Sequence, residues 1–120
     1  MTPFGARLRA LRAARGESLK SMADAIGISA AYLSALEHGR RGVPTWLLLQ
    51  RIIAHFNIIW DEAEDLQRLA EISDPRIVVD TASLSPLATE LANRLAHEIG
   101  HLSEAELAEM LAMLKAASRR

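Results

Sequence analysis

The residues with the most recognisable chemistry in this 120-residue sequence are two histidines one helical turn apart, with a glutamate between them. His97, Glu98 and His101 fit the spacing H-E-x-x-H, in which two imidazoles bind Zn²⁺ and the glutamate acts as a general base. Such a site also needs a third protein ligand, and no acidic residue that follows stands out for that role. On a helical wheel both histidines lie away from the apolar face. A polar helix surface is therefore the simpler interpretation, and a zinc metalloprotease is the remote alternative.

A second candidate chemistry is the binding of a polyanion. Residues 1–56 hold eight Arg or Lys and three Asp or Glu, whereas residues 57–120 hold six and twelve. A cationic half of this kind is typical of proteins that bind nucleic acid. An uneven distribution that arises by chance is the alternative.

Composition restricts the class of protein further. The absence of cysteine excludes disulfides and thiolate metal sites. No apolar run is long enough to cross a bilayer, and no apolar segment follows the N-terminal arginines as it would in a secretory signal. We therefore expect a cytoplasmic protein without a membrane anchor.

The elements that must position these residues are helices, because apolar side chains recur with helical spacing almost everywhere. Helices are expected from Phe4 to about Gly16, Ser18 to Gly27, Ser29 to about His38, Pro44 to about Phe56, Asp61 to about Ser73, Ser85 to about His101, and from Ser103 onward. The only β-like run is residues 76–80. With no partner strand in the chain, this run either pairs with its own copy in a dimer or forms an extended linker.

Residues 18–39 predict two short helices joined by a tight turn. Ala23 allows the helices to cross closely, and Gly27 can adopt the left-handed conformation that turns the chain. The inner faces would be buried by Met22, Ile26, Leu33 and Leu36. The outer face of the second helix is then free to enter a DNA major groove.

Over about residues 4–56 the sequence resembles the lambda-repressor/Cro-like family, also called XRE. The matching runs are Phe4–Arg12, Leu19–Ser29 and Tyr32–Arg41, followed by Pro44. The resemblance implies a five-helix DNA-binding domain, which we expect over residues 1–73, with the helix from Ser29 to His38 as its reader. It also implies a partly buried ion pair between Arg12 and Glu37. No enzymatic activity and no cofactor are expected.

The expected DNA contacts form two groups. Phosphate contacts are expected near the helix ends, from Lys20, Ser21, Arg40 and Arg41. Contacts from the start and middle of the reader are expected from Ser29, Ala30, Ala31, Tyr32, Ser34 and Ala35. Alanine cannot hydrogen-bond a base, so direct readout would depend on Tyr32 and Ser34, supplemented by DNA shape. Half-buried packing of Tyr32, and a solvated loop at Arg40 and Arg41, are the alternatives.

Residues 74–120 predict an extended segment followed by a two-helix dimerisation region. The apolar faces of the last two helices are too large to cover each other. The residues expected at the dimer interface are Ile77, Val79, Leu91, Leu95, Ile99, Leu107, Leu111 and Leu114. A two-fold dimer reads two half-sites about 34 Å apart. Packing of these faces onto the preceding helices of the same chain is the alternative.

Together these features predict an all-α, homodimeric, sequence-specific regulator of transcription that binds double-stranded DNA, most simply a repressor. A second hypothesis shares the first half of the chain. It is a DNA-binding antitoxin whose acidic second half binds a basic protein partner.

Overall fold

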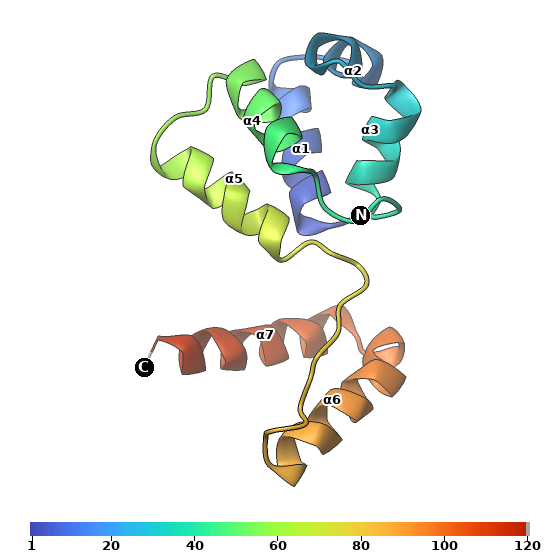
Figure 1. Ribbon diagram of the computed structural model, residues 1–120, viewed down its shortest axis with the longest axis vertical. Coiled ribbons are helices and arrows are strands. Elements are labelled where there is room, and N and C mark those ends of the chain that lie inside the picture. The colour runs from blue at the N-terminus through green and yellow to red at the C-terminus, as the bar shows by residue number, and fades with distance from the viewer. Residues whose placement is uncertain (120) are drawn as a thin grey trace. The chain divides into compact units, whose positions relative to one another are not determined.

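The computed structural model describes residues 1–119 as helices joined by loops (Figure 1). The helices are α1 (Pro3–Ala14), α2 (Leu19–Ile26), α3 (Ala30–Glu37), α4 (Trp46–His55), α5 (Asp61–Glu71), α6 (Pro86–Glu98) and α7 (Glu104–Ser118), with a short 3-10 helix η1 (Ile99–His101) before α7. The predicted all-α class is confirmed. Residues 76–80 are in an extended segment that forms no strand within the described chain.

The chain divides into two compact units, which we call the N-terminal unit (Met1–Ile77) and the C-terminal unit (Val78–Arg120). The N-terminal unit contains α1 to α5 and the C-terminal unit contains α6, η1 and α7. The assignment of DNA binding to the first part of the chain and dimerisation to the second stays a prediction.

Local hydrogen bonds start α2 and α3 where the sequence predicts. The hydroxyl Oγ of Ser18 accepts a hydrogen bond from the backbone N–H of Ser21 at 3.0 Å, which caps the first turn of α2. Gly27 ends that helix with φ of 82°, a left-handed conformation that favours glycine. The turn between the two helices is therefore determined by residues within it.

The start of α4 differs from the prediction. Pro44 was expected to open this helix, but it lies buried immediately before the cap. The cap is Thr45, whose Oγ1 accepts the backbone N–H of Leu48 at 3.2 Å. A proline fits either position, and the threonine hydroxyl can satisfy a free N–H of the first turn only when the helix begins at Trp46.

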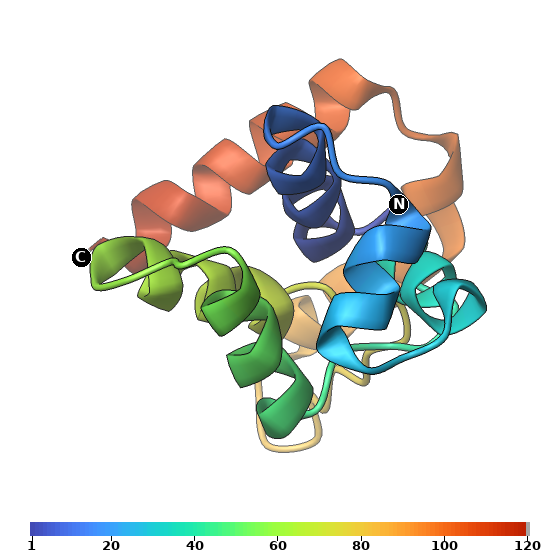
Figure 2. The same cartoon turned by 90° about the horizontal axis from the view of Figure 1, so that it is seen from above.

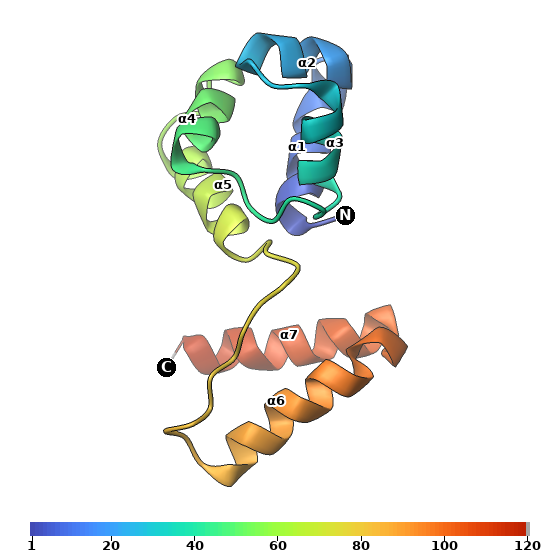
Figure 3. The ribbon, with the colours of Figure 1, turned by 45° about the vertical axis from the view of Figure 1, so that its right-hand side comes forward.

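The core of the N-terminal unit is formed by the inner faces of its five helices. Its buried apolar residues are Phe4, Leu8, Met22, Ala23, Ile26, Leu33, Leu36, Leu48, Leu49, Ile52, Ile58, Leu66 and Ala70. In Figures 2 and 3, α2 and α3 lie on one side of this unit and α4 and α5 on the other. Helix α1 contacts both α3 and α5, so it joins the two sides.

The start of α1 is held against the ends of two other helices. The backbone N–H of Thr2 donates to the carbonyl oxygen of Glu37 at 3.2 Å, and that of Phe4 donates to Ser73 Oγ at 2.9 Å. A Cβ atom built on Gly5 would lie 2.0 Å from the Glu37 carbonyl oxygen. The backbones of α1 and α3 therefore touch at Gly5, where there is no room for a side chain.

The C-terminal unit has well-formed helices and little interior. Helix α7 begins with a capping box in which Ser103 Oγ accepts the N–H of Glu106 at 3.1 Å, and the Glu106 carboxylate accepts the N–H of Ser103 at 2.9 Å. The hydrogen bond from the backbone N–H of Ser103 to the Glu106 carboxylate, and after it the interaction with the Ser103 side chain, lower the pKa of Glu106 below its usual value. None of residues 78–119 is buried, and α6 and α7 diverge from η1 (Figures 1 and 3).

Candidate nucleic-acid interface

Helix α3 has a buried inner face and an accessible outer face. Leu33 and Leu36 are fully buried in the core. Of the residues expected to contact DNA from the start and middle of the reader, Ser29 and Ala31 are exposed, Ser34 and Ala35 are partly exposed, and Ala30 and Tyr32 are half-buried with their side chains packed against the core. The accessible part of the helix is thus small and weakly polar. The Tyr32 side chain is half-buried and packed in this structure, which is the arrangement given above as the alternative to a base contact.

Cationic side chains lie at both ends of the α2–α3 helix pair. Lys20 and Ser21 lie exposed in the first turn of α2, and Arg40 and Arg41 lie exposed in the loop that follows α3. The side chains of Lys20, Arg40 and Arg41 make no hydrogen bond and no ion pair with any residue in 1–119. These charges are therefore available to an external anion.

An ion pair fixes the end of α3 to α1. Arg12 Nη2 lies 3.0 Å from Glu37 Oε1, and Arg12 Nε donates to Glu37 Oε2 at 3.2 Å, so the contact is bidentate. The Glu37 side chain is 1% exposed and that of Arg12 is 12% exposed. The pair implied by the sequence resemblance is present. It neutralises the one acid of α3 inside the unit, so that no negative charge of this helix faces outward.

A second polar cluster, which sequence reasoning missed, joins the loop after α1 to the end of α4. His55 Nε2 lies 2.6 Å from Glu17 Oε1, and Arg15 Nη1 donates to the His55 carbonyl oxygen at 2.7 Å. The Arg15 guanidinium also lies 5.3 Å from the ring centroid of Phe56. Glu17 and His55 are 38 positions apart in the sequence, and Arg15 and His55 are 40 positions apart. These residues share no sequence motif, so only the fold brings them together.

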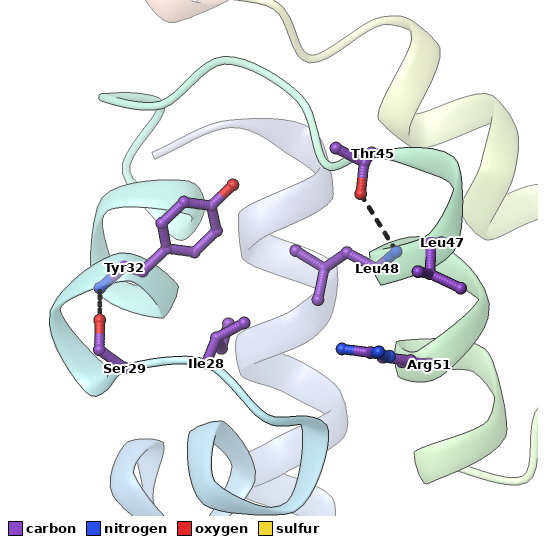
Figure 4. A pocket seen from close by; sticks show the side chains of 7 residues that line it. All are labelled: Ile28, Ser29, Tyr32, Thr45, Leu47, Leu48 and Arg51. Carbon is purple, nitrogen blue, oxygen red and sulfur yellow. Dashed lines mark hydrogen bonds between the residues drawn. The ribbon is translucent and has the colours of Figure 1, made fainter.

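An open groove of about 360 Å³ lies between α3 and α4 (Figure 4). It is lined by Ile28, Ser29, Tyr32, Thr45, Leu47, Leu48 and Arg51. Tyr32 forms one wall, and the Arg51 side chain extends from the opposite wall toward the turn between α2 and α3 (Figure 4). The groove therefore borders the first turn of α3. Arg51, a cation that the sequence did not assign, adds to the positive charge beside that turn.

The histidine spacing H-E-x-x-H does not form a zinc site. Helix α6 ends at Glu98, and residues 99–101 form η1, so His97 and His101 do not lie one turn apart on a single α-helix. His97 Nδ1 is 2.8 Å from the Asn93 carbonyl oxygen, a contact within its own helix. Across residues 1–119 no three His, Cys, Asp or Glu side chains are grouped so that they could hold a metal ion. The residues of this motif are therefore not joined by a third ligand in the described part of the chain.

None of the helices formed by residues 1–119 combines the length and the apolar character that a membrane span requires.

Known proteins similar to this chain are helix-turn-helix proteins. Two relatives from Bacillus subtilis (strain 168) are each 36% identical over 61 residues, which is 51% of this chain. They are the uncharacterized HTH-type transcriptional regulator RghRB and the HTH-type transcriptional repressor RghR. The match covers 44% and 45% of their lengths, so less than half of each curated relative is represented here.

Among solved structures, one from a SinR protein/SinI protein complex is similar, with 21% identity and a TM-score of 0.46. The similarity covers 98% of this chain and 99% of that chain.

The family described as helix-turn-helix domain matches residues 3–74, which is more than half of the chain and includes all five helices of the N-terminal unit. Domains of this family are binding modules and not enzymes. The match confirms the resemblance drawn from the residues between Phe4 and Pro44. The chain therefore belongs to the helix-turn-helix domain family.

Proposed function

We propose that this protein regulates transcription by binding double-stranded DNA, with α3 in the major groove. The observation that carries the proposal is the presence of exposed cationic side chains at both ends of the α2–α3 helix pair, whose second helix has an accessible outer face. Lys20 lies exposed at the start of α2, and Arg40 and Arg41 lie exposed directly after α3; none of the three forms a side-chain hydrogen bond or ion pair within residues 1–119. Basic side chains at helix ends neutralise DNA phosphates and set the orientation of a reader helix. The two Bacillus subtilis relatives, named as a transcriptional regulator and a transcriptional repressor, support the same proposal.

The small residues on the outer face of α3 favour binding that depends more on phosphates than on bases. Ala31 and Ala35 can contact a thymine methyl group but cannot hydrogen-bond a base edge. Ser34 is the remaining polar side chain in the middle of that face. We infer that much of the sequence preference comes from the shape and deformability of the DNA.

The test begins with selection of bound duplexes from a random library, followed by affinity measurements at several salt concentrations. The variant Arg40→Ala/Arg41→Ala should flatten the plot of log affinity against log salt by about 1.8, because each lost phosphate contact removes roughly 0.9 from the slope. The matched control is Arg68→Ala/Arg94→Ala, which removes the same charge from α5 and α6. An Arg40→Ala/Arg41→Ala variant with the wild-type slope would show that these arginines do not bind DNA.

We infer that the C-terminal unit is the dimerisation region. Two helices with no buried residue cannot be stable alone, because helices of this length depend on packing of an apolar face. Leu95 and Leu107 are only partly covered. The expected interface residues that remain more than half exposed are Ile77, Val79, Leu91, Ile99, Leu111 and Leu114.

A second copy of the chain is the partner that best accounts for this exposed apolar surface. A two-fold dimer presents two copies of α3 to two half-sites on the DNA. Once one copy has bound, the linkage raises the effective concentration of the second copy at its half-site. This gain offsets the weak base readout expected of a single α3.

Sedimentation of the full chain tests the dimer. The variant Leu91→Glu/Leu111→Glu should be monomeric and bind the selected duplex much more weakly. The control Ala96→Glu/Ala112→Glu adds the same charge at exposed positions outside the apolar faces and should remain dimeric. A wild-type chain that is monomeric alone but forms a complex with a basic protein would instead favour the antitoxin hypothesis.

A further inference from the structure

The ring of Tyr32 is held in place by the core of the N-terminal unit. Tyr32 lies in the first turn of α3, where its backbone N–H donates to Ser29 Oγ at 3.0 Å. Its side chain is half-buried, packs against the core and forms one wall of the groove beside α4 (Figure 4). The position of the ring is therefore determined by packing before any DNA is bound.

The guanidinium of Arg41 lies against that ring. Arg41 Cζ is 5.8 Å from the Tyr32 ring centroid, within the range in which the negative face of an aromatic ring attracts a cation. The loop that carries Arg41 is flanked by Gly39 and Gly42, both with positive φ. The neighbouring Arg40 side chain has no hydrogen bond, ion pair or ring contact within residues 1–119. Of the two loop arginines, only Arg41 is held.

We propose that Tyr32 is a positioning residue for Arg41 and does not read a base. The aromatic ring, and not the hydroxyl, fixes the guanidinium near α3, where it meets a DNA phosphate. Fixing a long side chain in advance lowers the entropy lost on binding. Since a phosphate contact carries no sequence information, Tyr32 strengthens binding to all duplexes alike. This inference rests on the proposed DNA-binding function.

The contact itself can be tested without DNA, in the full-length protein. A side chain over the face of an aromatic ring has its proton NMR signals shifted upfield by the ring current. The Arg41 Hδ signals should be shifted upfield in the wild type and in Tyr32→Phe, and should return to ordinary positions in Tyr32→Leu. Arg41 signals that are the same in all three proteins would overturn the proposed contact.

The functional role can be tested by a double-mutant cycle, with affinity measured for the selected duplex and for an unrelated duplex. Tyr32→Leu should weaken binding to both by about fivefold, because the Arg41 side chain is then free in the unbound protein and loses its conformational freedom only on binding. Tyr32→Phe keeps the ring and should bind as the wild type. In an Arg41→Ala background, the Leu and Phe variants should bind equally, since there is no guanidinium left to position.

Each competing role gives a different result. If the Tyr32 hydroxyl reads a base, Tyr32→Phe weakens binding to the selected duplex alone. If Tyr32 only supports the fold, Tyr32→Leu weakens DNA binding by the same factor in the wild-type and Arg41→Ala backgrounds. It then also lowers the melting temperature in proportion to the loss of affinity. Either result overturns the inference. A wild-type protein that binds no duplex DNA overturns the proposed function itself, whereas DNA binding without coupling between Tyr32 and Arg41 overturns only this inference.

Discussion

Replacing Gly5 with alanine has two opposite effects on the free energy of unfolding. In an open helix the change is favourable by about 1 kcal/mol, because alanine has the higher helix propensity. In this structure Gly5 lies in the first turn of α1 and is buried. The new Cβ would lie 2.0 Å from the carbonyl oxygen, 2.6 Å from the carbonyl carbon and 2.7 Å from the Cα of Glu37. All three are backbone atoms, so no side-chain rotation relieves the overlap.

The expected cost follows from the movement that removes this overlap. The closest distance must increase from 2.0 Å to at least 3.4 Å, so α1 and α3 must separate. That separation loosens the hydrogen bond from Thr2 N–H to the Glu37 carbonyl oxygen and the packing around Leu8. Overpacking costs about 1–3 kcal/mol and a lost hydrogen bond about 1 kcal/mol. After the propensity gain we expect Gly5→Ala to lower the free energy of unfolding by about 2 kcal/mol.

Urea unfolding of the full chain, followed by resolved NMR amide signals of α3, measures this loss. For a unit of this size a 2 kcal/mol change corresponds to a fall in melting temperature of roughly 10 °C. The control is Ala10→Gly at an exposed position of the same helix, which should lose about 1 kcal/mol from propensity alone. A Gly5→Ala variant that is about 1 kcal/mol more stable than the wild type would refute the reasoning.

Two further predictions concern polar pairs. Glu37→Ala should lower the free energy of unfolding by about 3 kcal/mol in calorimetry, because it leaves the largely buried Arg12 without its partner; a loss no larger than that of exposed Arg68→Ala would contradict this. The capping box lowers the pKa of Glu106, so the Glu106 carboxylate contributes fully to the stability of α7 when the pH is above the usual pKa of a glutamate. This contribution is lost as the pH falls through the lowered pKa. Ser103→Ala removes the side-chain contribution and keeps the larger one from the backbone N–H, so it should raise the Glu106 pKa part of the way toward its usual value in an NMR titration; an unchanged midpoint would show that the Ser103 side chain plays no part in lowering it.

Helix positions were predictable because their signals are local. Ser18 and Ser29 cap the helices that follow them, and Gly27 turns the chain with positive φ. Each of these interactions involves residues at most four positions apart, so the sequence displays both partners. Pro44 was misplaced because proline fits more than one position at a helix start, and the hydroxyl of Thr45 selects between them.

The candidate DNA-binding surface was predicted only in part. The spacing of apolar residues correctly placed the inner face of α3, and its flanking cations are exposed. The partial burial of Tyr32 and its contact with Arg41 depend on how the loop after α3 returns, which no local pattern describes. In the same way, the sequence contains the H-E-x-x-H spacing, but α6 ends at Glu98, within the motif, so the two histidines do not lie on one α-helix.

By itself the sequence determined which segments are helical, where most of them begin and which face of each is apolar. These properties depend on hydrogen bonds and side-chain spacing within a few residues. Only the tertiary structure decided that Gly5 touches Glu37, that Glu17 meets His55 and that Leu91 is left exposed. The physical reason is that such contacts join residues distant along the chain, and their distance is set by the packing of the helices on which they lie.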